Sequence, residues 1–420
     1  PMHSASGRYI ISYNGEVYNF GDLRSGLGSR GHSFRGHSDT EVILAAISEF
    51  GLDSALQRFI GMFAFALWDR EESVLYLVRD RMGIKPLYYG WTGQTLLFGS
   101  ELKALCAYPS FNAEIDRDAL ALQLRHNYVS APYSIYKGVY KLPPGTMMRI
   151  GSGDRPAPRS YWSVREAAES GLSQPFEGVP EEAAEELDTL LRDAVKKRMV
   201  SDVPLGALLS GGIDSSTVVA MMQSQSERPV RTFTVGFEED EFNEAAEAKR
   251  IAAHLGTDHT ELYASPRDAQ EVIQRLPTIY DEPFSDSSQI PTVLVSELTR
   301  NHVTVALSGD GGDELFFGYN HYALGRDLWK KLGWLPTPVR RWMAGAISLA
   351  PTLLLDTSFA WLMPALRRYG RDGKASAKAN RFAEILGAET SETMYRAITS
   401  HWKDPRSFVI GAGGETPRFG

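Results

Sequence analysis

Hydrophobic and polar positions follow different patterns in the two halves of the chain. In the first half, strand-length runs that are apolar or alternating, such as Phe59 to Asp69 and Ser73 to Gly83, predict a β-rich layer with helices. From Glu181 onward, strand-length apolar runs alternate with segments of helical periodicity. Such alternation predicts a parallel, doubly wound sheet. The pattern, in a chain of 420 residues, therefore predicts an α/β protein of two domains.

The first local feature that the pattern predicts is a β-hairpin within Gly7 to Tyr18. Asn14 and Gly15 stand between two strand-like runs, and Asn-Gly is a strong hairpin signal. An amphipathic helix is predicted to follow, in the sequence HSDTEVILAAISEFG. Either Ser38 or Asp39 can cap this helix, and capping is the plainest interpretation of Asp39.

Two loose segments mark the boundary between the predicted domains. Gly151 to Pro158 and Ser170 to Pro180 are rich in Gly, Pro and Ser, which is typical of linkers. We therefore expect one domain over residues 1–150, a linker over 151–180 and a second domain over 181–420.

The sequence VPLGALLSGGIDSS is the most informative stretch of the second domain. Leu205 to Leu209 predicts a buried strand, Gly211 and Gly212 permit a tight turn, and Ser215 opens a helical pattern. Backbone N–H groups at the start of a helix favour phosphate or pyrophosphate, and Asp214 is placed to hold an accompanying Mg²⁺. The alternative is a strand, turn and helix without a ligand, which is common in α/β proteins.

A second glycine-rich loop, SGDGGDELFFGY, follows a later predicted strand at Ser308. Ligands bind at the carboxyl ends of parallel strands, and acids near a phosphate chain need a metal ion between them. Mg²⁺ is therefore the expected companion of Asp214 and Asp313. The motif GxxxxGK[ST] does not occur in the sequence, so a Walker-type nucleotide site is excluded.

Composition and charge narrow the classes of function. The chain has 44 Lys and Arg against 52 Asp and Glu, so its net charge of −8 favours neither nucleic acid nor an anionic membrane as a partner. The single cysteine, Cys106, excludes a disulfide framework and a Cys-rich metal site, and fits a reducing cytoplasm. The nine His residues lack the spacing of a transition-metal site.

The most apolar late stretch, Trp342 to Leu355, is too short to span a membrane and contains Pro351. We expect it to form buried helices, with a helix at a membrane interface as the lesser alternative.

Nine motifs in order resemble the glutamine-dependent asparagine synthetase family over nearly the whole chain. The first half resembles its class II, N-terminal-nucleophile glutamine amidotransferase domain, and the second its ATP-pyrophosphatase domain. The motifs are YNGEVYNF, HSDTEVIL, FIGMFAFALWD, RDRMGIKPLYY, SELKAL, LLSGGIDSS, FTVGF, DEPFSDSSQIP and SGDGGDELFFGY. The resemblance implies an αββα sandwich followed by a doubly wound parallel sheet with a helical C-terminal part.

The resemblance also implies roles for individual residues. Asn14 and Gly15 would line the oxyanion hole of the glutaminase, and Gly15, Glu16 and Asp39 would bind glutamine. Asp310 falls where the family places an acid that acts around the β-aspartyl-AMP step. Asp214 and Asp313 would support Mg²⁺. The residues implied for ATP are Leu208, Ser210, Gly211, Gly212, Asp214, Ser215, Ser216, Val235, Ser308 and Gly309.

Two departures from the family pattern concern the ends of the sequence. The family's nucleophile is a cysteine at the start of the mature chain, whereas this sequence begins PMHSASGRY. Cys106 lies in the wrong place to replace it and is expected to pack as a small apolar residue. The sequence also stops before a later basic residue of the family. We therefore expect an internal fragment of a longer protein, with a glutaminase half that is inactive in the chain as given.

The expected reaction is glutamine-dependent asparagine synthesis. Glutamine would be hydrolysed to ammonia, which passes through a channel and displaces AMP from aspartate adenylated by ATP. Alternatives are a relative that amidates a sugar acid or other small carboxylate, and a catalytically inactive glutamine- or nucleotide-binding protein. A GMP or NAD synthetase is disfavoured by the hairpin ahead of the phosphate loop. A cytoplasmic location and a possible homodimer complete the expectation.

Overall fold

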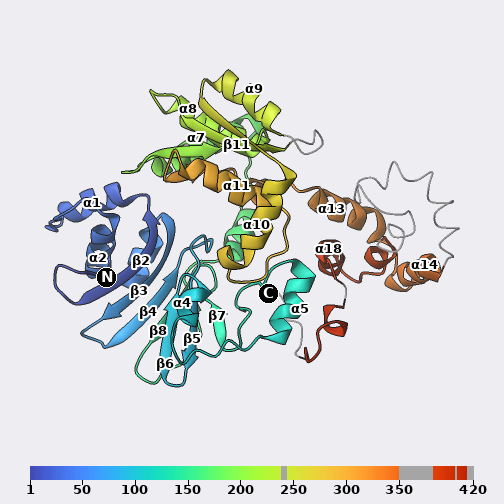
Figure 1. Cartoon of the computed structure of the whole chain (residues 1–420), viewed down its shortest axis with the longest axis horizontal. Coiled ribbons are helices and arrows are strands. Elements are labelled where there is room, and N and C mark those ends of the chain that lie inside the picture. The colour runs from blue at the N-terminus through green and yellow to red at the C-terminus, as the bar shows by residue number, and fades with distance from the viewer. Residues whose placement is uncertain (238–243, 350–381, 403, 414–420) are drawn as a thin grey trace. The chain divides into compact units, whose positions relative to one another are not determined.

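The computed structural model describes residues 1–237, 244–349, 382–402 and 404–413 (Figure 1). These residues form two compact units. The first unit comprises residues 1–123, 128–308 and those from 411 on, and the second comprises 124–127 and 309–410.

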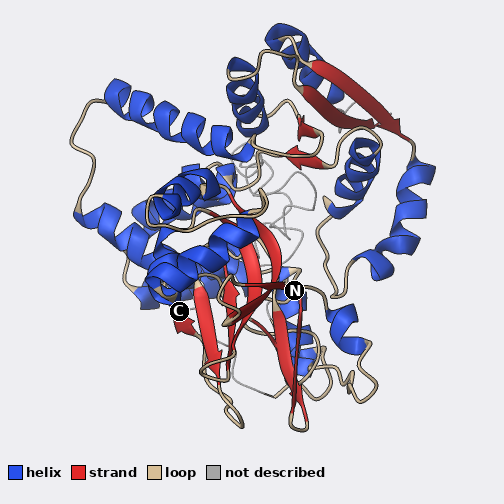
Figure 2. Cartoon of the chain, turned by 90° about the vertical axis from the view of Figure 1, so that its left-hand side faces the viewer, coloured by secondary structure: helices blue, strands red, loops and turns tan. Residues whose placement is uncertain are grey.

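The first unit begins with two antiparallel sheets that stack on each other (Figure 1, Figure 2). The larger sheet has the order β1 (Met2–His3), β2 (Tyr9–Val17), β3 (Gly61–Asp69), β4 (Val74–Arg79), β8 (Thr146–Ile150) and β9 (Arg159–Ser160). The smaller sheet has the order β6 (Thr95–Gly99), β5 (Tyr88–Thr92) and β7 (Val139–Lys141). The accompanying helices are α1 (Phe20–Gly28), α2 (Asp39–Phe50), α3 (Leu52–Arg58), α4 (Leu102–Cys106) and α5 (Arg117–His126).

Alternation along β3 explains the layers. Phe63 and Phe65 point into a core shared with α1, α2 and α3, whereas Ala64 and Ala66 point to the opposite face and pack against the smaller sheet. The far side of the smaller sheet is covered by α4 and α5. These layers of helix, sheet, sheet and helix confirm the predicted sandwich.

The predicted hairpin at Asn14 and Gly15 is wrong, because β2 runs through both residues as one strand. Gly15 lies opposite Phe63 and Val17 opposite Gly61 in the antiparallel ladder with β3. Gly15 has φ +151°, and a Cβ atom there would lie 2.2 Å from the Met62 carbonyl oxygen. The glycine therefore serves a close approach of two backbones inside the sheet rather than a turn.

The second half of the first unit contains a parallel sheet, in the order β12 (Asp258–Ala264), β11 (Arg231–Phe237), β10 (Leu205–Leu208) and β13 (Val305–Leu307). Its helices are α7 (Pro180–Arg198), α8 (Ile213–Ser224), α9 (Ala245–Leu255), α10 (Pro266–Ile279) and α11 (Gln289–Arg300). One core joins α7, α8 and α9 to β10, and another joins α10 and α11 to β11 and β12. Helices on both faces confirm the doubly wound prediction. The expected linker carries β9 and a helix, α6 (Val164–Ser173).

The second unit is helical. It contains α12 (Gly312–Phe316), α13 (Asn320–Leu332), α14 (Thr337–Leu349), α18 (Ser391–Thr399) and a short 3₁₀ turn, η4 (Pro405–Ser407). Leu328, Ile385, Met394 and Ile398 form its core. Among the helices that the structure describes, none combines the length and apolar composition needed to cross a membrane.

The prediction that Trp342 to Leu355 is buried is wrong where it can be tested. The segment is helical as far as Leu349, but the Trp342 and Leu349 side chains are 74% and 86% exposed. The buried residue of this helix is Arg340, whose guanidinium donates to the Leu335 carbonyl oxygen at 3.1 Å. Trp342 and Leu349 therefore point outward, whereas Met343 and Ile347 are half-buried. Pro351 to Leu355 lie outside the described residues.

Candidate functional site

The residues expected to bind glutamine lie around the second half of β2. Asn14, Gly15 and Glu16 are consecutive on this strand, and Asp39 is the first residue of α2. The Asp39 carboxylate accepts hydrogen bonds from the Tyr13 hydroxyl at 2.7 Å and the Val17 backbone N–H at 3.0 Å. Asp39 is thus hydrogen-bonded to Tyr13 and Val17, which flank residues 14–16 on β2. The fold therefore brings all four predicted residues together.

The cap of α2 is Ser38 and not Asp39. The Ser38 hydroxyl accepts a hydrogen bond from the Thr40 N–H at 3.1 Å, which leaves the Asp39 carboxylate directed at β2. Burial, together with the charge of Asp39, raises the pKa of the Tyr13 hydroxyl well above its ordinary value. Tyr13 therefore remains a neutral donor that fixes the Asp39 carboxylate.

Asn14 has a partner that the sequence did not identify. Its Nδ2 atom donates to the Ser100 hydroxyl at 3.0 Å, from the residue that directly follows β6. Ser100 is the first residue of the SELKAL motif, which was the only sequence signal for it. The Asn14 amide is thus oriented by the second sheet.

Glu16 occupies a strongly charged environment. Burial raises its pKa above the ordinary value, and the nearby carboxylates of Asp39 and Asp202 raise it further, whereas Lys85 and Arg198 oppose the shift. Arg198, at the end of α7, places its guanidinium 4.5 Å from the centre of the Tyr18 ring. Residues from the second half of the sequence therefore reach the strand that carries Glu16.

A buried carboxylate that sequence reasoning missed supports this site from behind. Asp80 is 1% exposed and accepts hydrogen bonds from the backbone N–H groups of Phe63, Met82, Ile84 and Lys85, at 2.9 to 3.1 Å. Phe63 is the residue opposite Gly15 in the ladder. Asp80 thus fixes the RDRMGIK loop to the strand that supports the predicted oxyanion residues.

Cys106 does not pack in the core as expected, because it is an exposed free thiol. The five-residue helix α4 buries Leu102 and Leu105, so Cys106 faces outward.

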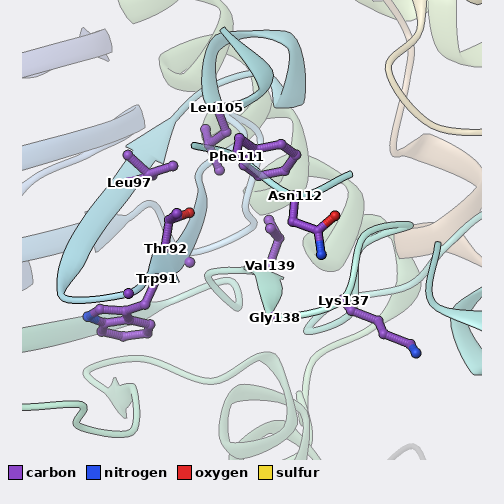
Figure 3. A pocket seen from close by; sticks show the side chains of 11 residues that line it. Trp91, Thr92, Leu97, Leu105, Phe111, Asn112, Lys137, Gly138 and Val139 are labelled. Carbon is purple, nitrogen blue, oxygen red and sulfur yellow. The ribbon is translucent and has the colours of Figure 1, made fainter. Parts of the chain in front are cut away.

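A cavity of about 250 Å³ near α4 lies between β5, β6 and the segment before β7. Figure 3 shows its apolar side chains Leu97, Leu105 and Phe111, with Lys137 extending away from them. The cavity contains none of the predicted site residues.

The predicted phosphate loop is a compact serine and glycine turn after β10. The Ser215 hydroxyl lies 2.9 Å from that of Ser210 and 3.2 Å from the Ser210 N–H, and the Ser216 hydroxyl donates to the Gly212 carbonyl oxygen at 2.6 Å. Gly211 has φ +85°, a conformation that suits glycine, and a Cβ there would lie 3.0 Å from the Glu247 side chain on α9. These contacts fold the loop over the start of α8.

The start of α8 has the features of an anion site. The helix begins at Ile213, two residues earlier than expected, and no side chain in the described part of the chain caps it. Asp214 lies in its first turn, where its carboxylate makes no hydrogen bond or ion pair with any described residue. A 12-residue helix with an open N-terminus favours a phosphate group.

The residues expected around adenosine lie on three adjacent strand ends. The register pairs Leu208 with Phe233 on β11 and Ala207 with Leu307 on β13. Val235 lies two residues beyond Phe233, and Ser308 directly follows Leu307. The sheet therefore brings Leu208, Val235 and Ser308 to its carboxyl edge, where α/β proteins bind ligands.

The acidic loop continues into the second unit, which holds Gly309, Asp310 and Asp313. Gly311 adopts a left-handed conformation, φ +92°, just before α12, and Asp313 lies in the first turn of that helix. A Cβ at Gly318 would lie 1.8 Å from Asp313 Oδ1, so a larger residue there would require the Asp313 side chain to move. The described residues contain no group of three or more possible metal ligands, and the expectation that Asp214 and Asp313 share Mg²⁺ stays a prediction.

Two sequence families match the chain. The family described as asparagine synthase matches residues 186–417, and the family described as glutamine amidotransferase domain matches residues 1–162.

Three relatives illustrate the similarity. A putative asparagine synthetase [glutamine-hydrolyzing] 2 from Methanocaldococcus jannaschii is 40% identical over 314 residues, which cover 74% of this chain and 59% of the relative. Asparagine synthetase [glutamine-hydrolyzing] 1 from Bacillus subtilis is 36% identical, over 77% of this chain and 49% of the relative. A putative asparagine synthetase [glutamine-hydrolyzing] from Mycobacterium bovis is 38% identical, over 81% and 52%. The chain thus spans about half the length of the curated relatives it matches.

Proposed function

Since the chain belongs to the asparagine synthase family, we propose that the full-length protein makes asparagine from aspartate, ATP and ammonia released from glutamine. Glutamine and water give glutamate and ammonia. Aspartate and ATP give β-aspartyl-AMP and pyrophosphate, and ammonia then displaces AMP to form the amide. The observation that supports this most strongly is that all four predicted glutamine residues and the phosphate loop lie in one compact unit.

The proposal assigns glutamine hydrolysis to residues 1–150 and synthesis to residues 181–420, joined by the linker 151–180. The Asn14 amide and the Gly15 N–H would donate to the oxyanion that develops on the glutamine amide. The carboxylates of Glu16 and Asp39 would bind the substrate ammonium group. Because Asp39 is already held by Tyr13 and Val17, this part of the site is formed before glutamine arrives.

For ATP, the N–H groups of the loop from Ser210 to Ser216 would hold the pyrophosphate, with Leu208, Val235, Ser308 and Gly309 around the adenosine. Mg²⁺ fits the unpartnered carboxylate of Asp214, since hard oxygen ligands suit this ion. Asp214 and Asp313 would hold it, and the ion would neutralise phosphate charge as the bond between the α- and β-phosphates breaks. Asp310 would act near the adenylated carboxylate.

The aspartate adenylation step can be tested by ATP–pyrophosphate exchange in the full-length protein with a panel of carboxylates. Exchange should depend on aspartate, and Asp214→Asn should lower it by about 100-fold or more while glutamine hydrolysis continues. Exchange with a sugar acid and not with aspartate would reassign the acceptor. Equal loss of both activities in the variant would contradict the division of labour. A cytoplasmic location, consistent with the single cysteine, is part of the proposal.

A further inference from the structure

Two consecutive acidic residues, Asp281 and Glu282, are largely buried in the connection between α10 and α11. Their side chains are only 14% and 11% exposed. Burial of a carboxylate is unfavourable unless the charge is paired and hydrogen-bonded. The partners of these two side chains therefore show which parts of the protein hold the connection in place.

Both carboxylate oxygens of Glu282 have polar partners from the first half of the sequence. One carboxylate oxygen accepts from the Ile135 backbone N–H at 2.9 Å. The other lies 2.5 Å from the Lys141 ammonium and 3.3 Å from the Tyr88 hydroxyl. Lys141 is itself only 15% exposed, and its burial lowers its pKa while the charge of Glu282 opposes that shift.

The neighbouring residues extend the same contact. Asp281 accepts from the Lys103 backbone N–H at 3.0 Å and pairs with the Lys103 ammonium at 3.2 Å. Ser285 accepts a hydrogen bond from the buried Gln123 amide at 2.6 Å. Residues 281, 282 and 285 of the connection are thus bound to β5, β7, α4 and α5.

These contacts join the two parts of the protein that the proposed function assigns to different reactions. Tyr88, Lys103, Ile135 and Lys141 lie in the part that matches the glutamine amidotransferase family, and Glu282 lies in the part that matches the asparagine synthase family. All of them belong to the first compact unit. The segment they hold runs directly into Asp286, whose carboxylate accepts from the Ser288 N–H at 2.8 Å at the start of α11.

We propose that Asp281 and Glu282 are positioning residues that hold the 281–288 segment on the amidotransferase part and so couple ammonia release to its use. The inference rests on the proposed function and deepens it. The ion pair of Glu282 with Lys141 is the centre of this coupling, because both charges are buried and each would be left unpaired by loss of the other.

The test compares Glu282→Gln with unmodified full-length protein. Three rates are measured: glutamine hydrolysis, asparagine formation from glutamine, and asparagine formation from ammonium chloride. The amount of asparagine formed per glutamine hydrolysed should fall about fivefold, with the ammonium-dependent rate within about twofold of the unmodified protein. An unchanged ratio, or an equal loss of all three rates, would overturn the proposal.

A matched control is Glu114→Gln, which breaks an exposed Lys–Glu pair with Lys137 and should leave the ratio unchanged. Should Glu282→Gln fail to fold, Lys141→Met/Glu282→Gln removes both buried charges and keeps an acceptor for the Ile135 N–H. The same fall in the ratio is expected from it.

Hydrogen exchange provides a readout that does not depend on activity. Amide exchange in residues 281–288 should rise in Glu282→Gln and stay unchanged in Glu114→Gln. If the unmodified protein makes no asparagine, the proposed function fails, and the holding role of Glu282 is still supported by faster exchange. Unchanged exchange in that variant would overturn the holding role.

Discussion

Strand β2 and the phosphate loop after β10 both carry predicted site residues, but they hold them in different ways. Around β2, the Asp39 carboxylate accepts hydrogen bonds from the Tyr13 hydroxyl and the Val17 N–H, and Asp80 behind the strand accepts four backbone N–H groups. At the phosphate loop, Asp214 makes no hydrogen bond or ion pair with the described residues, and α8 starts without a side-chain cap.

The polar groups around β2 stabilise the fold, whereas the Asp214 carboxylate and the open start of α8 at the phosphate loop are available to bind a ligand. Carboxylates that accept backbone N–H groups contribute to folding stability, and replacing them leaves buried donors without partners. Polar groups at an open helix start contribute little to folding and much to anion binding. Replacing a buried carboxylate around β2 should therefore lower stability, and replacing the Asp214 carboxylate at the phosphate loop should lower ligand binding only.

The largest effect is expected from Asp80→Ala. The change leaves the N–H groups of Phe63, Ile84 and Lys85 without their acceptor in a site that is 1% exposed. We expect a loss of about 3–5 kcal/mol in the free energy of unfolding, measured by urea denaturation.

The matched variant for Asp80→Ala is Asp214→Asn, which should change the free energy of unfolding by less than about 0.5 kcal/mol. If the two variants lost equal stability, the contrast between the two regions would be wrong.

Gly15→Ala is expected to rank second. The new Cβ would lie 2.2 Å from the Met62 carbonyl oxygen and 2.6 Å from the Phe63 Cα, at a φ of +151° that side chains rarely adopt. Separation of β2 from β3 should lower the free energy of unfolding by about 2–4 kcal/mol in urea. Gly26→Ala, inside α1 with no atom within 4 Å of its Cβ, should instead gain about 0.5–1 kcal/mol. A neutral Gly15→Ala would show that the strands can move apart.

The sequence predicted most elements, since their hydrophobic period reports directly which side is buried. The strands of the parallel sheet and the helices between them were found in this way. The hairpin at Asn14 and Gly15 was predicted wrongly because one property of glycine, its missing Cβ, serves both turns and close strand contacts. Sequence spacing does not distinguish these uses.

Asp80, Ser100 and Glu282 were not identified from the sequence, and the reason differs from that for the hairpin. Ser100 and Glu282 act through partners that are distant in the sequence: Asn14 and Ser100 are 86 positions apart, and Ile135 and Glu282 are 147 apart. Asp80 joins its own loop to Phe63, which lies 17 positions earlier on β3. A local pattern reports an acid or a serine but not the backbone N–H group that meets it. Only the fold identifies those partners.

Ser100→Ala tests a weaker interaction of the β2 region, the hydrogen bond between Asn14 and Ser100. Loss of the 3.0 Å hydrogen bond frees the Asn14 amide to rotate, so glutamine hydrolysis by the full-length protein should fall about fivefold in kcat/KM, about 1 kcal/mol. The free energy of unfolding should change little because Asn14 is exposed. Ser25→Ala, which removes a hydroxyl bonded to the Gly21 carbonyl oxygen in α1, is the matched control. No change in kcat/KM would remove Ser100 from the site.

The smallest effect concerns the pH dependence of stability set by Glu16. Burial and the charges of Asp39 and Asp202 raise its pKa above the ordinary value, so the folded state disfavours the ionised form. Its contribution to stability is therefore full below the unfolded-state pKa and is lost as the pH rises through the folded-state pKa. The free energy of unfolding of the unmodified chain, minus that of Glu16→Gln, should fall as the pH rises above about 4 in urea titrations. In an Asp202→Asn background the fall should be smaller and should end at lower pH, because a carboxylate that raises the folded-state pKa of Glu16 is gone. A difference that rises with pH would mean that Lys85 and Arg198 outweigh burial at Glu16 and hold this acid ionised before a ligand binds.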